Sequence, residues 1–326
     1  HAKRNEHTIN GQLRISYGGS QTLTNPRHAD PVVLQLLKDI GVDVERFKTA
    51  YDMDFFKRHD LGAVTYFNEE VFGQDTVVRH PYSNYYNYVE GLQGAKISNE
   101  EAAQQAPLSE QGKQQLLRVL NGGLHKLDVP EEELRDYIRT HSYFDYLKNT
   151  LGVDDPGVLR MARHTGLDWG SAGTDVMSIG AAKGAGAMGF EPVAIYDEDN
   201  PYIHHFPDGN AGIARALVKK MIPGVAPGNT AEDLVLARFN YGKLDQCGNA
   251  VRIRLNSTAV RVQHAGAPAS SGDVTIGYVN DNKLSQVKAK GVVMACYNAI
   301  IPHIVKGLPD EQAEALTLQG KSPLQY

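Results

Sequence analysis

Apolar and polar side chains alternate in two short runs near the start of the chain. Residues 6–9 and 13–17 have the pattern of extended segments, and Asn10-Gly11 lies between them. Asn-Gly between two alternating runs predicts a tight hairpin, because both residues tolerate the positive φ of a type I′ turn. We therefore expect a hairpin that leads directly into Gly18-Gly19.

From about residue 31 to residue 167, apolar residues recur at helical spacing. Ser98 followed by Glu101 has the pattern of a capping box, and residues 121–123 (Asn-Gly-Gly) have the pattern of a helix end. Pro130 followed by three glutamates predicts a further helix start, since acids are favourable at the positive end of a helix. The pattern predicts several helices in succession.

The rest of the chain changes character twice. Residues 180–186 are rich in glycine and alanine, and a further helix is expected from Asn210 to Met221. Beyond it the pattern predicts strands: residues 251–255 and 259–262 alternate, residues 274–279 lead into a turn at 280–282, and residues 292–296 form a continuous apolar run that predicts a buried strand.

Composition narrows the functional classes. The 326 residues allow roughly two domains at about 150 residues each. Lys and Arg (33) nearly balance Asp and Glu (38) without charged blocks, which argues against a nucleic-acid-binding protein. Two cysteines exclude a disulfide scaffold and a four-cysteine zinc site. With no apolar run of about 18 residues we expect no membrane span, and since the chain begins at His1 we interpret it as a fragment.

A G-x-G-x-x-G pattern occurs at residues 184–189, but its context does not fit a dinucleotide site. No clear buried strand precedes it, and Pro192 disfavours a helix at Glu191. We interpret it as a flexible loop.

The turn at residues 206–210 is a better phosphate candidate. Asp208 or Asn210 can cap the following helix, and Gly209 and Gly212 allow a ligand to approach the backbone near unpaired N–H groups. The alternative, a capped helix with nothing bound, is the more common situation for such a sequence and stays open. Lys3 and Arg4 could meet an anion, and Gly18-Gly19 could lie under a planar ligand.

Other chemistry is less well supported. His204 and His205 with Asp208 invite a metal site, but adjacent strand residues point to opposite faces and no third ligand has standard spacing, so we expect none. The two serines next to glycines, Ser20 and Ser171, do not fit the G-x-S-x-G motif, so the sequence does not support the nucleophile of an α/β-hydrolase. One aromatic cluster is a pocket candidate, although such clusters are usually core or interface; it comprises His80, Tyr82, Tyr85, Tyr86 and Tyr88.

Four segments in order carry a resemblance to a known family. They are residues 1–5 (HAKRN), 17–21 (YGGSQ), 200–210 (NPYIHHFPDGN) and 292–298 (VVMACYN). Together they resemble FAD-dependent flavin amine oxidoreductases, most closely bacterial spermidine dehydrogenase-like proteins. The resemblance runs along the whole chain, and residues 200–218 are its most distinctive part. The family's N-terminal G-x-G-x-x-G unit and its C-terminal segment have no counterpart in this chain.

The resemblance implies FAD as cofactor. It places Lys3 and Arg4 near the phosphates, Gly18, Gly19 and Ser20 under the isoalloxazine, and the backbone of Val260 on the adenine side. The loop Pro207, Asp208, Gly209 and Asn210 corresponds to a glycine loop of the family fold. Lys321 matches the lysine that holds a water at flavin N5; alternatively, it is a solvated lysine near a helix end. Haem cannot be inferred from the sequence.

These observations predict a mixed α/β (α+β) chain with a FAD/NAD(P)-binding domain of the amine oxidase type. We expect residues 1–30 and 196–296 to form the FAD-binding domain. Residues 31–195 should form an inserted, helix-rich substrate domain, and residues 297–326 should return to the substrate domain. The expected activity is oxidation of the C–N bond of an amine or polyamine by hydride transfer to the flavin.

A polycationic substrate would favour carboxylates in its channel. The candidates are Glu69, Glu70, Glu90 and Asp168, although acids in such loops are far more often simply exposed to solvent. The alternative function is a catalytically inactive, flavoprotein-like chain that binds a ligand or partner. The sequence leaves the electron acceptor open, and for location the family slightly favours the periplasm over the cytoplasm.

Overall fold

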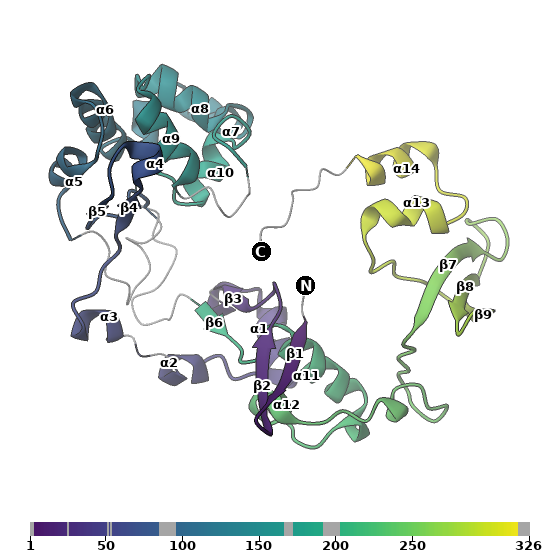
Figure 1. Ribbon diagram of the computed structural model, residues 1–326. Coiled ribbons are helices and arrows are strands. Elements are labelled where there is room, and N and C mark those ends of the chain that lie inside the picture. The colour runs from purple at the N-terminus through teal and green to yellow at the C-terminus, as the bar shows by residue number, and fades with distance from the viewer. Residues whose placement is uncertain are drawn as a thin grey trace. The chain divides into compact units, whose positions relative to one another are not determined.

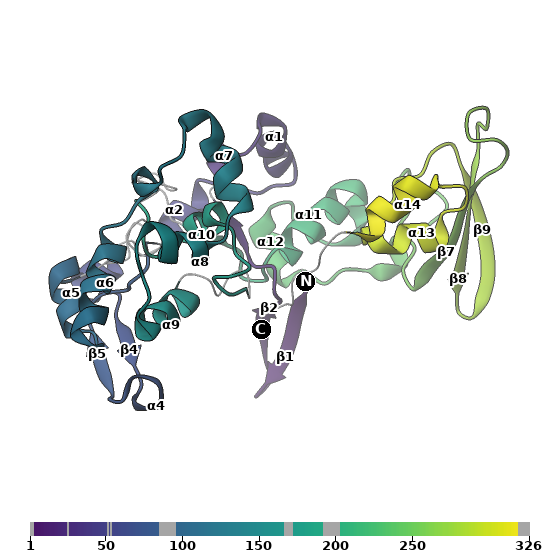
Figure 2. The same ribbon diagram turned by 90° about the horizontal axis from the view of Figure 1, so that it is seen from above.

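The computed structural model describes residues 3–24, 26–50, 52, 54–84, 96–165, 172–191 and 203–318. Its internal contacts divide the chain into two units, drawn in Figure 1 and, turned by 90°, in Figure 2. The described parts of His1–Leu217 and Gly228–Ala237 belong to the first unit. Val218–Pro227 and the described residues from Arg238 onward belong to the second. Each unit is described by itself.

The chain begins with the predicted hairpin. β1 (Arg4–Ile9) pairs antiparallel with β2 (Gln12–Tyr17), and Arg4 lies opposite Tyr17. Asn10 and Gly11 have φ values of 51° and 77°, the positive values that a type I′ turn requires. The prediction of a hairpin at these residues is confirmed.

A second antiparallel pair joins parts of the first unit that are distant in sequence. β3 (Thr22–Thr24) pairs with β6 (Ile203–His205), with Leu23 opposite His204. The same region contains five helices and one 3₁₀ turn: η1 (Pro26–His28), α1 (Pro31–Asp39), α2 (Arg46–Ala50), α3 (Phe55–Arg58), α11 (Ala211–Met221) and α12 (Ala231–Leu236). The start of α11 matches the helix expected from residue 210.

The remainder of the first unit, residues 65–84, 96–165 and 172–191, is helix-rich and is called the helical block below. Its elements are β4 (Thr65–Phe67), α4 (Glu69–Phe72), β5 (Thr76–Val78), α5 (Asn99–Gln105), α6 (Glu110–Leu120), η3 (Leu124–Lys126), α7 (Glu131–Thr140), α8 (Tyr143–Asp145), η4 (Tyr146–Thr150), α9 (Pro156–His164) and α10 (Ile179–Gly184). The Ser98–Glu101 capping box, the helix end before Asn121 and the helix start after Pro130 are all confirmed.

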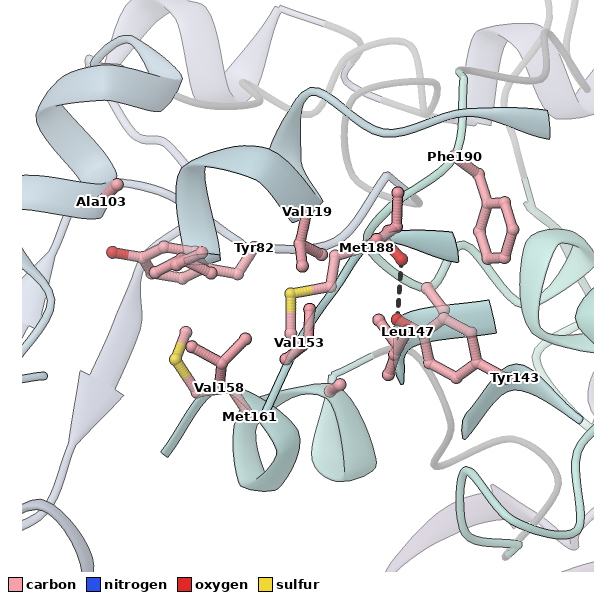
Figure 3. Close-up of a cluster of buried hydrophobic side chains, with 14 of the residues drawn as sticks. Tyr82, Ala103, Val119, Tyr143, Leu147, Val153, Val158, Met161, Met188 and Phe190 are labelled. Atoms are coloured by element: carbon pink, nitrogen blue, oxygen red, sulfur yellow. Dashed lines mark hydrogen bonds between the residues drawn. The ribbon is translucent and has the colours of Figure 1, made fainter. Parts of the chain in front are cut away.

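One continuous apolar core holds the helical block together, and Figure 3 shows part of it. Three tyrosines are fully buried in this core, and each hydroxyl bonds a backbone carbonyl. Tyr82 donates to Ala102 O (2.6 Å) and Tyr143 to Met188 O (2.7 Å), while the Tyr146 hydroxyl lies 2.7 Å from Gly189 O. Burial raises the pKa of all three hydroxyls, so they remain neutral donors.

The second half of the G-x-G-x-x-G segment, residues 186–189, is buried in the helical block, while Gly184 is exposed. It follows helix α10 and not a strand, which agrees with its rejection as a dinucleotide site. The expectation of a flexible loop is wrong for this half, because Ala187 and Met188 are at most 1% exposed and the next residue, Phe190, is also buried. Gly186 and Gly189 have positive φ and turn the chain so that these side chains enter the core.

The second unit is built around a three-stranded antiparallel sheet. β7 (Ser257–His264) pairs with β8 (Val274–Asn280), which pairs with β9 (Lys283–Ala289). Asp281 and Asn282 have positive φ, which confirms the predicted turn. The other elements are η6 (Pro223–Val225), η7 (Tyr241–Lys243), η8 (Asn298–Ile300), α13 (Ile301–Ile304) and α14 (Asp310–Thr317).

Two expected strands in this unit are wrong. Residues 251–255 and 292–296 belong to no strand, and Val293 is 89% exposed. A short alternating or apolar run forms a strand only where a neighbouring strand supplies N–H and C=O partners. Neither of these two runs has such a partner strand among the described residues.

The described residues form both helices and strands, which agrees with the expected mixed α/β class. The paired strands β1–β2, β3–β6, β4–β5 and β7–β8–β9 are antiparallel. In the part of the chain that the structure describes, no helix combines the length and the apolar character needed to cross a bilayer.

Candidate functional site

Two of the glycine-rich segments singled out in the sequence meet in the first unit. We call this region the junction: residues 3–4, 17–22 and 204–210 with the start of α11. Gly209 has a φ of 64°, and a Cβ atom there would lie 2.8 Å from both Ser20 O and Tyr17 Cβ. The Asn210 N–H donates to Ser20 O (3.0 Å), and its side-chain amide donates to Ser20 Oγ (2.9 Å) and Thr22 O (3.1 Å). The turn at 206–210 is therefore packed directly against the segment that follows the hairpin.

A buried carboxylate lies at the centre of the junction. Asp208 is 1% exposed, and its Oδ2 lies 3.4 Å from Arg4 Nη1 and 3.8 Å from Arg215 Nε. Burial raises the pKa of Asp208, and the charges of Arg4 and Arg215 oppose this shift without cancelling it. The aspartate thus joins the hairpin, the turn and α11 through charge.

The same two arginines hold the end of α12. Arg4 donates to Val235 O and pairs with Glu6 (2.7 Å). Arg215 Nη2 donates to Ala237 O (2.5 Å) and to Leu234 O (2.8 Å). Carbonyl groups at a helix C-terminus carry partial negative charge, so guanidinium groups are natural partners for them.

Two histidines of β6 enter the junction from opposite faces of the strand, as the alternation of strand side chains requires. His204 is completely buried beside Phe47 (5.0 Å between ring centroids), and neither ring nitrogen has a hydrogen-bond partner among the described residues. His205 packs edge-on against Tyr17 (4.4 Å), and its Nε2 is also buried without a partner there. Burial lowers the pKa of both histidines, so the neutral imidazoles are favoured.

Several N–H groups of the turn and of the start of α11 donate to carbonyl groups of the chain itself. Gly209 N donates to Phe206 O (2.9 Å) and Gly212 N to Gly209 O (3.0 Å). The Asp208 carboxylate lies over the helix start, where a Cβ on Gly212 would be 2.7 Å from its Oδ1. The side chains of Asp208 and Asn210, the two expected caps, are thus directed to Arg4 and to Ser20. No N–H group of α11 donates to either side chain among the described residues, so the expected cap at Asp208 or Asn210 is wrong.

The other residues assigned to cofactor binding differ in position. Lys3 and Gly19 are exposed, while Gly18 and Ser20 are half-buried; Gly18 N donates to Lys3 O (2.8 Å). Pro207 is exposed at the tip of the turn. Val260 lies on β7 in the second unit, whose placement relative to the junction is not described. Lys321, the expected water-holding lysine, lies outside the described residues.

A cleft of about 580 Å³ opens beside the junction. His205, Phe206 and Pro207 form one side of it, and Phe47 and Val235 contribute apolar surface from α2 and α12. An ion pair between Arg46 and Glu232 (3.0 Å) also belongs to its lining. Its volume lies within the range of about 300–1,000 Å³ that is typical of small-molecule sites.

The aromatic pocket candidate is wrong for the two members that the structure describes. Tyr82 belongs to the helical core, and His80 is buried with both ring nitrogens bonded: Nδ1 accepts from Tyr82 N–H (3.0 Å), and Nε2 lies 3.2 Å from Asn99 Oδ1. Burial lowers the pKa of His80, and the Asn99 bond opposes this shift. Tyr85, Tyr86, Tyr88, Glu90 and Asp168 lie outside the described residues. Glu69 and Glu70 are exposed in the first turn of α4.

Sequence reasoning missed Arg215, the second partner of Asp208, and the complete burial of His204. A signal for Arg215 existed: it follows Gly212 by three residues, so both share a helix face, and Gly212 contacts Asp208. No comparable signal marks His204. Among the described residues, no cluster of three or more His, Cys, Asp and Glu side chains has the arrangement of a metal site.

Comparison with known proteins assigns no family. No family model matches the chain, and none of the curated proteins matches it.

Proposed function

We propose that the chain is the cofactor- and substrate-binding part of a FAD-dependent oxidoreductase that oxidises the C–N bond of an amine or a polyamine of the spermidine type. The observation that carries the proposal is the contact between Gly209 and residues 17–20, because it joins two segments of the family resemblance that lie far apart in the sequence. The resemblance supplies the identity of the cofactor and of the reaction.

The unpartnered polar atoms of the junction fit one part of FAD better than another. Asp208 Oδ1, Asn210 Oδ1 and His205 Nε2 are buried without partners among the described residues, and with His205 neutral all three can accept hydrogen bonds. Acceptors suit the hydroxyl and ring N–H groups of a flavin nucleotide and do not suit its phosphates. The exposed Lys3 is the group that suits a phosphate.

The chain's own residues would fix the backbone on which the ring lies. Asn210 bonds Ser20 and Thr22, so the Gly18–Ser20 segment is attached to the turn before any ligand arrives. A bare backbone at Gly19 lets a planar group approach more closely than any side chain would. When bound, FAD would supply the acceptor for a hydride from the amine α-carbon, and water would hydrolyse the resulting imine to an aldehyde and an amine.

Flavin titration tests the proposal directly. Free FAD is titrated with the purified chain, and binding is followed by quenching of flavin fluorescence. We expect saturable binding, at least tenfold weaker for Gly19→Val, because a branched side chain would occupy the face on which the ring lies. Gly266→Val is the matched control: a Cβ there meets no atom within 4 Å, so binding should be unchanged.

A second measurement tests the reaction. In the absence of oxygen, spermidine or another amine should bleach the visible flavin absorbance of the loaded protein. Absence of flavin binding would overturn the proposal and favour the alternative of a non-catalytic ligand- or partner-binding chain. Binding without bleaching by any amine in a panel would retain the cofactor and reject the amine substrate.

A further inference from the structure

A groove with largely apolar walls lies in the helical block and shares no lining residue with the junction. It has a volume of about 980 Å³ and lies between the β4–α4 segment and helix α9. Figure 2 shows α9 beside β4, and Arg160 of α9 reaches the carbonyl of Val71 on α4 (3.5 Å). Phe67, Phe72, Phe144 and Leu159 give the groove an apolar lining.

The cationic side chains of this groove come from one face of α9. Pro156, Leu159, Arg160, Arg163 and His164 all line it, and their spacing of i, i+3, i+4, i+7 and i+8 places them on one stripe of the helix. Val158 and Ala162 on the opposite face are buried in the core, and Met161 borders both the core and the groove. A helix dipole explains basic residues in a last turn, but it does not explain why they share a stripe with the apolar wall of a groove.

The charges of the groove are not balanced from within. Its lining includes Arg160, Arg163 and His164 but no carboxylate, and none of the three forms an ion pair within the described residues. Asp75, the carboxylate bonded by the Tyr66 hydroxyl (2.6 Å), also accepts from Glu69 N (2.8 Å) and lies outside the lining. An apolar groove whose edge carries guanidinium groups without a carboxylate partner among the described residues is complementary to a molecule with an apolar body and an anionic end.

We propose that this groove is a binding site for an amphipathic carboxylate, a molecule such as a medium-chain fatty acid, with its carboxylate at Arg160 and Arg163 and its apolar body against Phe67, Phe72 and Leu159. The proposal is independent of the proposed redox function. A protonated polyamine would not bind in this groove, because the cationic side chains of α9 repel it. The groove and the junction would therefore bind different ligands.

The test compares ligands of equal chain length and different charge. Octanoate, octanol and octylammonium are titrated into the full chain, and binding is followed by amide chemical shifts of Val71 and Thr174, which line the groove. We expect octanoate to bind at least tenfold more tightly than the other two. Equal binding of all three would reduce the groove to a general apolar surface and overturn the proposal.

A pair of variants tests whether the named arginines are responsible. Arg160→Gln combined with Arg163→Gln should weaken octanoate binding at least tenfold, and both side chains are exposed, so the fold should be kept. Arg139→Gln is the matched control, because Arg139 is an exposed arginine in the last turn of α7 and does not line the groove. An equal loss in the control and the double variant would mean that only overall charge matters, and the proposal would be wrong.

Discussion

The core of the helical block and the junction both bury polar groups, but they treat them differently. In the helical block, Tyr82, Tyr143 and His80 are buried and every one has a bonded polar atom. In the junction, His204 has two buried nitrogens without a partner among the described residues, and Asp208 and Asn210 each have one such oxygen. A buried polar group without a partner destabilises the fold by about 1–3 kcal/mol. The bonded polar groups of the helical block therefore avoid a cost that the unbonded groups of the junction incur.

This difference is informative about function. Natural cores satisfy nearly all of their buried polar groups, so each exception needs an explanation, and a ligand that supplies the missing partner is one. The helical block shows no such exception among its described side chains. Apart from His264 Nδ1 on β7, the exceptions among the described residues gather where glycine-rich segments from distant parts of the sequence meet, which is the region that the cofactor proposal concerns.

The largest loss of stability is expected at Gly209, where the turn lies closest to the segment that follows the hairpin. Gly209→Ala would place a Cβ 2.8 Å from Ser20 O in a residue with φ of 64°, and we expect a loss of about 3 kcal/mol from the steric clash and the left-handed backbone together. Hydrogen exchange of the Asn210 amide, which donates to Ser20 O, measures the local loss. Gly248→Ala, where a Cβ has no neighbour within 4 Å, should stay within about 0.5 kcal/mol. Unchanged protection in Gly209→Ala would mean that the two segments are not in contact.

A smaller loss is expected in the helical core. Tyr143→Phe removes the donor to Met188 O and leaves that carbonyl buried, which should lower the free energy of unfolding by about 1–2 kcal/mol. Urea denaturation measures this change. Tyr66→Phe serves as control, since Tyr66 is 59% exposed and its hydroxyl bonds an exposed carboxylate. Similar losses in the two variants would show that burial does not decide the value of the bond.

The corresponding change in the junction should have the opposite sign. His204→Leu removes two unpartnered nitrogens and keeps an apolar contact with Phe47, so we expect a gain of about 1 kcal/mol. Because burial lowers the pKa of His204, with Arg27 acting in the same direction and Glu45 against it, the unfolded chain takes up the proton first. Wild-type stability should therefore fall as the pH drops below about 6.5, and the leucine variant should lose less. A destabilised leucine variant would reveal a partner for the imidazole.

The contrast between the regions also explains which features could be predicted. The hairpin at Asn10-Gly11 and the capping box at Ser98 depend on residues within a few positions of each other, so the sequence contains the whole cause. The strand expected at residues 292–296 was wrong, because an apolar run does not specify its partner strand. The glycine-rich segments were identified as candidates from their residue types, but the ion pairs from Asp208 to Arg4 and Arg215 depend on contacts between distant parts of the chain.

The smallest effect is expected at an exposed carboxylate that is well bonded. Glu191 is 40% exposed and accepts hydrogen bonds from the backbone N–H of Leu124 (3.0 Å) and from His125, whose Nδ1 lies 2.6 Å away. Burial raises the pKa of Glu191, but the bonds from His125 and Leu124 outweigh it and lower the pKa to about 2.

The lowered pKa gives Glu191 a stabilising effect that is present above about pH 4.5 and is lost as the pH falls towards 2, because the unfolded chain is protonated first. Solvent screening at this exposed site reduces the contribution to about 1 kcal/mol. Glu191→Gln should lose that amount at pH 7 and show a flatter stability profile below pH 4.5, measured by urea denaturation at several pH values. Glu314→Gln, an exposed glutamate of α14, should show neither change. A Glu191→Gln profile as steep as that of the wild type would place the acid sensitivity elsewhere, in Asp52 or Asp60, whose pKa values are also lowered by arginine or lysine partners.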